Sequence, residues 1–265
     1  MVLRSALRVK QNRPQEKLPV HQPICYGEFS PCGDRLPARA DTMHTPLFMI
    51  ATGLASYLIG AIPFGFLIAR LRGVDIRAVG SRNIGATNVF RSVGKGWGIA
   101  TFLLDMGKGW CGAVVVPALA ARLLGGTLGE RAAEWRLLGG VCAVAGHTWP
   151  VYLGFRGGKG VATSAGMLLG VAPAAVALAL AGWLAALLVS RTVSLASILA
   201  AVVLGLAIWF PPFRPAHGWL PPLVLTLLAG LVIARHRANI RRLRAGTEPR
   251  LAFGRRAPSP ETPPT

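Results

Sequence analysis

Gly80–Arg91 reads GSRNIGATNVFR, and it is the polar stretch around which the apolar remainder of the chain is arranged. It offers short hydrogen-bonding side chains and two arginines, Arg82 and Arg91, but no carboxylate. Gly80 and Gly85 let the backbone turn tightly and approach a ligand closely. Many donors without an acid favour binding of a phosphate-like anion. The simpler interpretation of this stretch alone is a solvated loop between two membrane helices.

The composition is typical of a membrane protein. Of the 265 residues, 52% are hydrophobic and 15% are charged, and the apolar residues lie in runs of roughly 16 to 25. The formal net charge is +19, but the basic residues sit in short segments between the apolar runs. Cytoplasmic flanks of membrane helices explain that pattern better than binding to nucleic acid. We therefore expect an all-α integral membrane protein in contact with lipids, with no nucleic-acid partner.

Three segments follow from the composition along the chain. Residues 1–42 are polar and lack periodicity, so we interpret them as a disordered N-terminal extension that is not part of the natural protein. They contain no apolar core of a signal peptide, and Met43 is the expected natural start. Residues 43–251 form the membrane domain, and residues 252–265 form a disordered tail rich in proline.

Seven apolar segments are predicted as membrane spans. Pro63 is the expected kink of the first span, and Pro173 and the Ser190–Thr192 break divide the long run from 160 to 210. One long span and one ordinary span would also fit that run. The seven segments cover about 46–70, 97–123, 136–154, 160–172, 174–190, 193–210 and 218–234.

Positive charge decides between the two counts. The loop 71–96 and the tail after 234 are both rich in arginine, so both should be cytoplasmic. An even number of crossings after the first span is then needed, which seven spans satisfy. We predict a seven-span helical bundle with the N-terminus outside, the C-terminus inside and three polar motif loops on the cytoplasmic side. The positive charges of residues 1–42 oppose that orientation, and a start at Met43 removes the conflict.

A second polar stretch reads GHTWP at 146–150 and FRGGKGVAT at 155–163. Its Gly157–Gly160 turn leads into an apolar helix, where backbone N–H groups and Lys159 can hold a phosphate. The residue after Lys159 is Gly160, so the turn is not a P-loop. The plain alternative is a flexible basic turn at the membrane surface.

A third stretch, RHRANIRRLRAGTE at 235–248, begins directly at the end of the last apolar run. His236, Asn239 and Leu243 share one helical face. Binding of anionic lipid heads is the simpler interpretation of a basic helix at this place, but it leaves His236 and Asn239 at the membrane boundary unexplained. Asp105 and Lys108, three residues apart in the second apolar run, are expected to form a structural ion pair, and a contribution to the rim of the active site is the alternative.

Several kinds of catalysis find no support in the sequence. No His and carboxylate cluster suggests a metal, and the four cysteines, Cys25, Cys32, Cys111 and Cys142, lack metal-ligand spacing. No G-x-S-x-G surrounds a serine nucleophile, and neither His147 nor His236 is followed by the Asp of a His-x₄-Asp acyltransferase pattern. We expect no cofactor and no metal.

The three polar stretches together resemble the bacterial membrane acyl-phosphate:glycerol-3-phosphate acyltransferases. That family shows G-S-G-N-[PI]-G-A-T-N-x-x-R, G-H-x-x-P-x-x-x-x-F-x-G-G-K-G-V-A-T and R-H-x-x-N-I-x-R-L-x-x-G-x-E, in this order. The resemblance covers about residues 47–251 and departs at Arg82, where the family usually has Gly. It implies a seven-spanning bacterial inner-membrane enzyme with its site on the cytoplasmic side. It also implies transfer of an acyl group from acyl phosphate to the 1-hydroxyl of glycerol 3-phosphate, giving lysophosphatidic acid and phosphate.

Roles for single residues then follow as hypotheses from charge and motif position. Arg91 and Lys159 are the main phosphate partners, Asn83 and Asn88 orient the glycerol hydroxyls or the phosphate, and His236 is the favoured general base. A phosphate oxygen of a substrate is the alternative proton acceptor. The predicted catalytic residues are Ser81, Arg91, Lys159, His236 and Asn239, and the predicted substrate-binding residues are Asn83, Gly85, Thr87, Asn88, Gly157, Gly158, Gly160, Thr163 and Glu248.

Because acyl phosphate is already activated, direct attack by the alcohol is expected, without a covalent enzyme intermediate. A functional link to the enzyme that makes acyl phosphate is also expected. The competing class is a transporter or flippase for an organic phosphate, although no internal repeat is visible. A lipid-binding scaffold would explain the basic tail but neither of the first two polar stretches.

Overall fold

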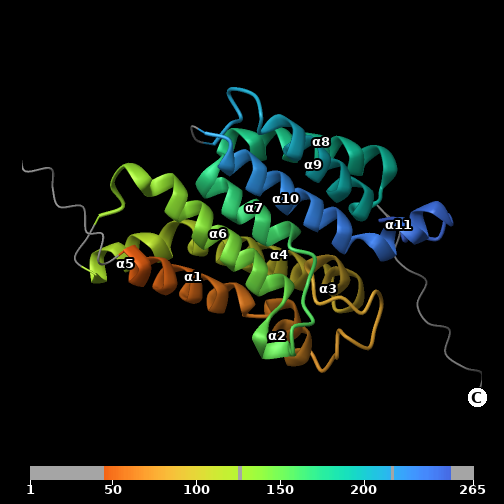
Figure 1. The fold of residues 1–265 in the computed structure, drawn as a ribbon. Coiled ribbons are helices and arrows are strands. Elements are labelled where there is room, and N and C mark those ends of the chain that lie inside the picture. The colour runs from red at the N-terminus through yellow and green to blue at the C-terminus, as the bar shows by residue number, and fades with distance from the viewer. Residues whose placement is uncertain (1–44, 125–126, 216–217, 252–265) are drawn as a thin grey trace, which may run out of the picture. The chain divides into compact units, whose positions relative to one another are not determined.

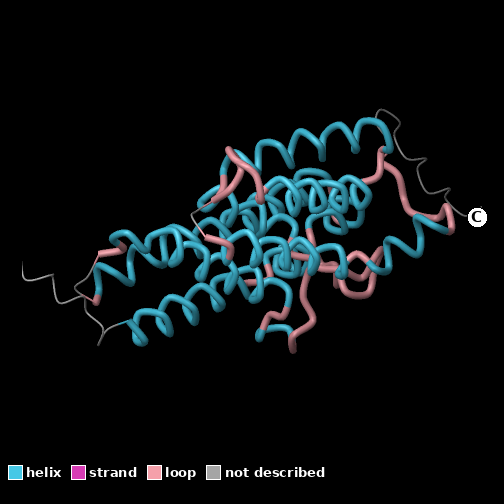
Figure 2. The backbone as a smooth tube through the Cα atoms, turned by 45° about the horizontal axis from the view of Figure 1, so that its top comes forward, coloured by secondary structure: helices cyan, strands magenta, loops and turns pink. Residues whose placement is uncertain are grey.

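The computed structural model describes residues 45–124, 127–215 and 218–251, and every regular element within them is helical. The predictions made for residues 1–42, for Met43 and for the tail 252–265 lie outside these ranges. Figures 1 and 2 show the path of the chain. The helices are α1 (Thr45–Ala61), α2 (Phe64–Leu71), α3 (Ala86–Ser92), α4 (Lys95–Trp110), α5 (Val116–Leu123), α6 (Ala132–Thr148), α7 (Val161–Val171), α8 (Pro173–Ser190), α9 (Val193–Ala207), α10 (Leu220–Arg235) and α11 (Arg237–Arg244).

The helix boundaries follow the prolines and polar breaks of the sequence. Pro63 separates α1 from α2, as expected, and Pro173 is the first residue of α8, where its missing N–H costs nothing. A π-helical turn, Cys111–Val115, joins α4 to α5, so this apolar run is continuous from Lys95 to Leu123. Short 3₁₀ turns precede and follow α6, at Gly129–Arg131 and Val151–Leu153. Helices therefore occupy all seven predicted apolar segments, although the third ends at Thr148 and the sixth at Ala207.

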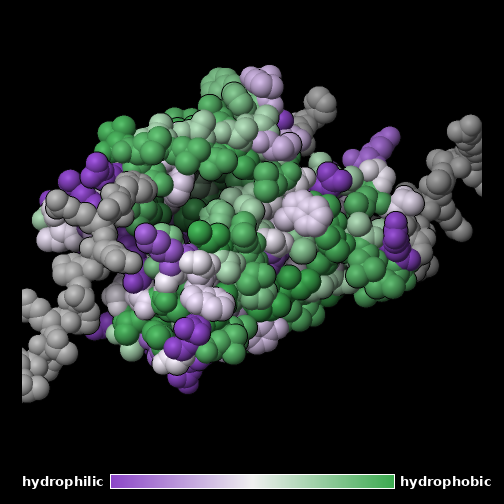
Figure 3. Space-filling view, turned by 180° about the vertical axis from the view of Figure 1, so that it is seen from behind, coloured by the Kyte–Doolittle hydropathy of each residue, from purple (hydrophilic) through white to green (hydrophobic). Residues whose placement is uncertain are grey.

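Three helical runs among the described residues are long and apolar enough to cross a membrane: Pro46–Leu71, Lys95–Leu123 and Pro173–Ser190. A fourth results if α10 and α11, which are bent by 55° at His236, are counted as one broken span. Val161–Val171 and Val193–Ala207 are shorter apolar helices. The space-filling view shows apolar side chains across the middle of one face and polar ones gathered toward its ends (Figure 3). These helices are membrane helices, and the number of seven crossings stays a prediction.

Close packing through small residues holds the helices together. α1 packs along α6 and α4 along α7, while α9 packs against both α8 and α10 (Figure 1). A Cβ added to Gly60 of α1 would lie 2.1 Å from the carbonyl oxygen of Ala143 in α6, and one added to Gly166 of α7 would lie 1.8 Å from that of Met106 in α4. Glycines at such contacts let helix backbones approach within the lipid phase, where burial of apolar surface adds little.

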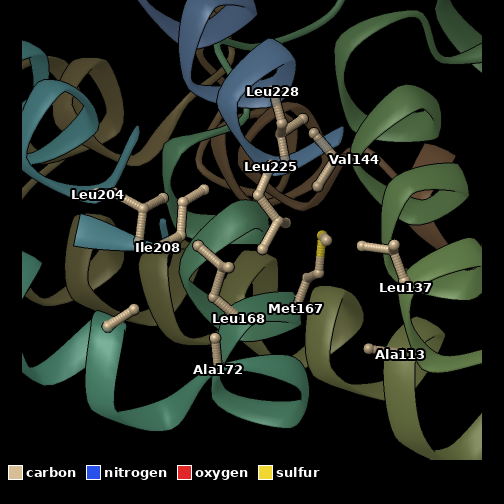
Figure 4. Packing of buried hydrophobic residues seen from close by; sticks show 11 residues of the cluster. Ala113, Leu137, Val144, Met167, Leu168, Ala172, Leu204, Ile208, Leu225 and Leu228 are labelled. Carbon is tan, nitrogen blue, oxygen red and sulfur yellow. The ribbon is translucent and has the colours of Figure 1, made fainter. Parts of the chain in front are cut away.

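The largest apolar cluster lies where α7 meets α6, α9 and α10. Met167 of α7 and Leu225 of α10 are fully buried there, and Ile208 closes the α9 side (Figure 4). Because this cluster fixes α7 against α10, it also fixes the loop before α7 against the residues that follow α10. Those two segments carry the second and third polar stretches.

Candidate functional site

Lys159 and Asn239 meet at the centre of the candidate site. The Lys159 Nζ donates a hydrogen bond of 2.6 Å to Asn239 Oδ1, across 80 residues of sequence. Lys159 lies in the turn before α7, and Asn239 lies buried in the first turn of α11. The 55° bend after α10 turns α11 so that Asn239 faces that loop. The second and third polar stretches are thus in direct contact.

Glu248 organises the other side of Asn239. Its Oε1 accepts hydrogen bonds from Asn239 Nδ2 at 2.6 Å and from Ser194 Oγ at 2.7 Å, and its Oε2 accepts from Arg242 Nε at 2.7 Å. Burial raises the pKa of this carboxyl, but the hydrogen bonds from Asn239, Ser194 and Arg242 outweigh burial, so the pKa is lowered. Glu248 is therefore a carboxylate whose oxygens are already occupied, and it orients Asn239.

The first polar stretch joins the site through Arg91 of α3. Its Nη2 donates a hydrogen bond of 3.0 Å to the carbonyl oxygen of Pro249. The backbone N–H of Leu251 donates to the carbonyl oxygen of Arg191, at 2.7 Å, which ties the segment after α11 to the start of α9. Arg91, Lys159 and Asn239 are thus brought around one docked C-terminal segment, although they come from three distant parts of the chain.

The Gly157–Gly160 turn is fixed by hydrogen bonds with His147 of α6 and with Arg235 at the end of α10. The N–H of Gly158 donates to the carbonyl oxygen of His147 at 3.1 Å, and the Arg235 guanidinium donates to the carbonyl oxygens of Gly157 and Gly158 at 3.1 to 3.3 Å. A Cβ on Gly158 would lie 2.0 Å from His147 Nε2, so only glycine fits there. Gly160 has φ +84°, a left-handed conformation that glycine adopts without strain, and it starts α7.

His236 lies at the junction of α10 and α11 and is 2% exposed. Its Nδ1 is 2.8 Å from the carbonyl oxygen of Val232, so Nδ1 carries the proton and donates it to that carbonyl. The neutral ring then leaves Nε2 unprotonated. This tautomer leaves Nε2 able to accept a proton, and the role of His236 as general base stays a prediction.

The loop before α3 is organised by Asn88. Its Nδ2 donates to the carbonyl oxygens of Ile76, Val79 and Asn83, and its Oδ1 accepts from the N–H of Ser81 at 3.0 Å. Asn88 is 3% exposed, so its amide is used within the loop and does not face a ligand. The structure gives it a positioning role where sequence reasoning suggested direct substrate contact.

The remaining predicted residues divide into surface and interior positions. Ser81 is exposed, Thr87 is half-buried, and Asn83 Oδ1 accepts from the N–H of Gly85 at 2.9 Å. Thr163 is fully buried in α7, and a Cβ on Gly109 of α4 would lie 2.0 Å from its carbonyl oxygen. Thr163 thus belongs to the α4–α7 packing, and its Oγ1 has no hydrogen-bond partner in the described part of the chain.

A second polar cluster lies deeper, between α4 and α6. Lys108 Nζ is 2.8 Å from Asp105 Oδ1, which confirms the expected ion pair, and it donates to the carbonyl oxygen of Ile62 at 2.7 Å. His147 Nδ1 lies 3.6 Å from the same Asp105 oxygen. These side chains are between 2% and 5% exposed. His147 therefore contacts both polar clusters, because its Nε2 lies against Gly158 and its Nδ1 faces Asp105.

The candidate site carries excess positive charge. Burial lowers the pKa of Lys159 to about 8; the nearby Glu248 raises it, while Arg242 and Arg91 lower it further. Three cationic side chains thus share one carboxylate that is already saturated with hydrogen bonds. Such an arrangement is suited to a phosphate dianion, because an anion would relieve the repulsion among the cations.

Sequence reasoning missed three residues of this network: Ser194, Arg235 and Arg242. Ser194 lies two residues after Thr192, the end of the Ser190–Thr192 break. The break by itself indicates only a helix boundary. Arg235 and Arg242 belong to the third polar stretch, but their role toward backbone carbonyls and toward Glu248 depends on the bend after α10. A polar residue just after a break between two apolar runs was the available signal for Ser194.

Fold and site together define a helical membrane protein in which Arg, Lys and amide donors from three distant segments meet. The family model described as glycerol-3-phosphate acyltransferase matches residues 50–246. The glycerol-3-phosphate acyltransferase of Geobacter sulfurreducens is 48% identical over 204 residues, which covers 76% of this chain and 96% of that protein. The chain therefore belongs to the glycerol-3-phosphate acyltransferase family.

Solved structures agree with this assignment. The crystal structure of PlsY (YgiH), an integral membrane glycerol 3-phosphate acyltransferase, in its glycerol 3-phosphate form has a TM-score of 0.67 and 37% identity, and covers 77% of this chain and 96% of that one. Its lysophosphatidic acid form has a TM-score of 0.64 and 36% identity, with 77% and 95% covered. This chain is thus an acyltransferase and an integral membrane protein.

Proposed function

We propose that this enzyme transfers an acyl group from acyl phosphate to the 1-hydroxyl of glycerol 3-phosphate. The products are lysophosphatidic acid and inorganic phosphate. The contact of Lys159 with the Asn239–Glu248 pair, and of Arg91 with the adjacent Pro249, carries the proposal, because both substrates bear phosphate and must lie side by side. The relatives support it, since one solved structure holds glycerol 3-phosphate and another holds lysophosphatidic acid.

The transfer is a direct displacement at the acyl carbonyl carbon. The 1-hydroxyl oxygen forms a bond to that carbon, and the bond from the carbon to the phosphate oxygen breaks. The hydroxyl proton passes to His236 Nε2 or to a phosphate oxygen of a substrate, and the phosphate leaves as an anion held by the cationic side chains. Mixed anhydrides need positioning and charge stabilisation more than they need a protein nucleophile.

Ser194 is the residue that could challenge direct transfer. Its Oγ donates to Glu248, which formally resembles a nucleophile beside a base. It is, however, 5% exposed, and the accepting carboxylate oxygen also holds Asn239. A structural hydrogen bond within the site explains Ser194 fully. The variant Ser194→Ala should therefore retain measurable transfer, whereas a covalent route through Ser194 requires complete loss.

The proposed enzyme lies in the bacterial inner membrane with its site facing the cytoplasm. The arginines of the loop before α3 and of α11 flank apolar helices, and positively charged flanks stay on the cytoplasmic side. Both sets of flanks lie next to the candidate site in the sequence. Labelling of single cysteines placed at Arg82 and at Arg244 tests the orientation, because both should react only after the membrane is opened.

The activity is tested with purified protein, palmitoyl phosphate and glycerol 3-phosphate. Release of phosphate and formation of lysophosphatidic acid should occur together, one for one, and only when both substrates are present. Palmitoyl-CoA offered in place of palmitoyl phosphate should give no product. Product from the thioester alone would overturn the assignment of the donor, while uptake of glycerol 3-phosphate into proteoliposomes without product would favour transport.

A further inference from the structure

A basic cavity lies beside the Gly157–Gly160 turn, and Gly157 forms part of its wall. Its volume is about 590 Å³. It opens between the loop before α3, the loop before α7 and the end of α10, and neither Lys159 nor Arg91 lines it. The lining residues that carry charge are Arg77, Arg82, Arg156, Arg235 and Asp75.

Two of the four guanidinium groups are fixed in place. Arg77 donates to both Asp75 carboxylate oxygens, at 3.0 and 2.9 Å, and lies 4.7 Å from the ring centre of Phe66. Arg235 is fixed by the carbonyl oxygens of Gly157 and Gly158. Groups held in this way lose little side-chain entropy when an anion binds, so the cavity walls are prepared for one.

The other two guanidinium groups stand at the rim. Arg82 and Arg156 are exposed, and no hydrogen bond or ion pair joins the guanidinium group of either one to another described residue. Arg82 also has φ +56°, a conformation that costs free energy for a residue with a Cβ. Four guanidinium groups face one carboxylate, an excess of three positive charges, and that carboxylate is already paired with Arg77.

Exposed aromatic side chains are found in the segment that forms one wall of the cavity. Phe155 lines the cavity and is 59% exposed, and Trp149 and Tyr152 beside it are also exposed. Trp and Tyr are enriched at the level of lipid headgroups, where one side of the ring is apolar and the other is wet. Ile84 and Leu153 add apolar wall to the cavity. Basic pockets at that level of a membrane protein bind anionic headgroups.

We propose that this cavity is a second phosphate-binding site beside the transfer site, with Arg235 and the backbone of Gly157 and Gly158 standing between the two. Its ligand carries a phosphate group, supplied either by an anionic lipid headgroup or by a free phosphate ion. Arg82 and Arg156 close on the ligand from the rim, and Arg77 and Arg235 face it from the walls. The proposal concerns binding and does not depend on the acyl donor or on the route of transfer.

The experiment counts ligands bound to the full chain. The Arg91→Ala variant is the background, because its transfer site is disabled while the cavity is intact. The cavity is altered by Arg82→Gly with Arg156→Gln, and the matched control is Arg122→Gln with Arg136→Gln, which removes two exposed arginines elsewhere on the surface. Both double changes lower the net charge by the same amount.

Two arms identify the source of the phosphate. Native mass spectrometry measures binding of dioleoyl phosphatidic acid against dioleoyl phosphatidylcholine, and equilibrium dialysis measures binding of inorganic phosphate. Loss of charge-assisted hydrogen bonds predicts a drop in affinity of about tenfold or more in the cavity variant and none in the control. A drop confined to phosphatidic acid assigns the site to a lipid, and one confined to inorganic phosphate assigns it to a soluble anion.

Equal affinity of the cavity variant and the control variant for both probes would overturn the proposal. The same result follows if the Arg91→Ala background binds neither probe, because the four arginines would then be ordinary surface charge. Both outcomes can be told apart from a failure of the proposed function. The cavity variant keeps Arg91, so in the absence of the Arg91→Ala change it should form lysophosphatidic acid at the wild-type rate.

Discussion

Asp105, Lys108 and His147 lie buried between α4 and α6, where the charges of Asp105 and Lys108 neutralise each other. Lys159, Arg91 and Arg242 gather instead around the single carboxylate of Glu248, which is saturated by its own hydrogen bonds. Positive and negative charge balance in the first cluster, which we call the closed cluster. The second, which we call the open cluster, carries more positive than negative charge. A closed cluster can only hold helices together, while an open one is completed by the ligand.

The two clusters touch at one point. The ring of His147 supports Gly158, which is next to Lys159, and the backbone of His147 accepts the hydrogen bond that shapes the turn. The buried cluster therefore sets the position of the cation in the open cluster. Changes in the open cluster should affect catalysis with stability preserved, and changes in the buried cluster should affect stability first.

The largest effect is expected from removal of the cations that complete the open cluster. Lys159→Ala and Arg91→Ala should each lower the rate of lysophosphatidic acid formation by about 10³-fold or more, because stabilisation of developing charge is lost. Their unfolding midpoints in detergent should match wild type. Lys95→Ala, which removes an exposed lysine at the start of α4, is the control and should keep full activity. Normal transfer by either site variant would refute the phosphate role.

Opening the closed cluster should cost folding free energy. Asp105→Asn leaves the Lys108 ammonium buried without its counter-charge, which costs about 3–5 kcal/mol when one partner of a buried pair is removed. The unfolding midpoint measures this loss. Replacing both partners, as Asp105→Leu with Lys108→Met, should recover most of the stability. If the single and double variants unfold alike, the pair does not act as a structural unit.

Adding a methyl group where the two clusters meet should lower both the stability and the activity. Gly158→Ala places a methyl group against the buried His147 ring, and overpacking of this kind costs about 1–3 kcal/mol. The turn can escape the clash only by moving Lys159, so transfer should fall by about 10- to 100-fold. Adding His147→Ala makes room for the methyl group and should restore part of the rate. A Gly158→Ala enzyme of wild-type activity would show that the turn is not rigid.

The smallest effect is expected from pH. The pKa of Lys159 is lowered to about 8, so its charged fraction falls as pH rises through that value. Because a phosphate dianion needs the ammonium form, kcat/KM for glycerol 3-phosphate should fall about tenfold from pH 7 to pH 9. Lys159→Arg keeps its charge throughout and should lose this alkaline limb. The same limb in that variant would assign it to another group.

The sequence predicted much of this molecule because the deciding signals were local. Apolar runs and prolines located the helices, and three polar motifs named Arg91, Lys159, His236 and Asn239. The ion pair of Asp105 and Lys108 followed from their spacing of three along a helix.

The rest depends on the path of the chain between helices. The contact of Ser194 with Glu248 needs the bend after α10 and the return of the segment behind α11, and neither has a periodic signal. Asn88 was expected at the ligand because of its position in the first polar motif, yet its loop uses both polar atoms of the amide. The meeting of His147 with Gly158 is equally invisible, because it depends on how α6 ends against the turn.

The docking of residues 247–251 against Arg91 and Arg191 also sets when the site comes into being during synthesis. A nascent chain that has inserted α10 already holds Arg91 and Lys159, but it has neither the amide that Lys159 contacts nor the carboxylate that orients that amide. Residues 237–251 must be synthesised before Lys159 can contact Asn239 and before Asn239 can contact Glu248. The contacts of the candidate site are therefore complete only after the segment that follows α11 has been synthesised and docked.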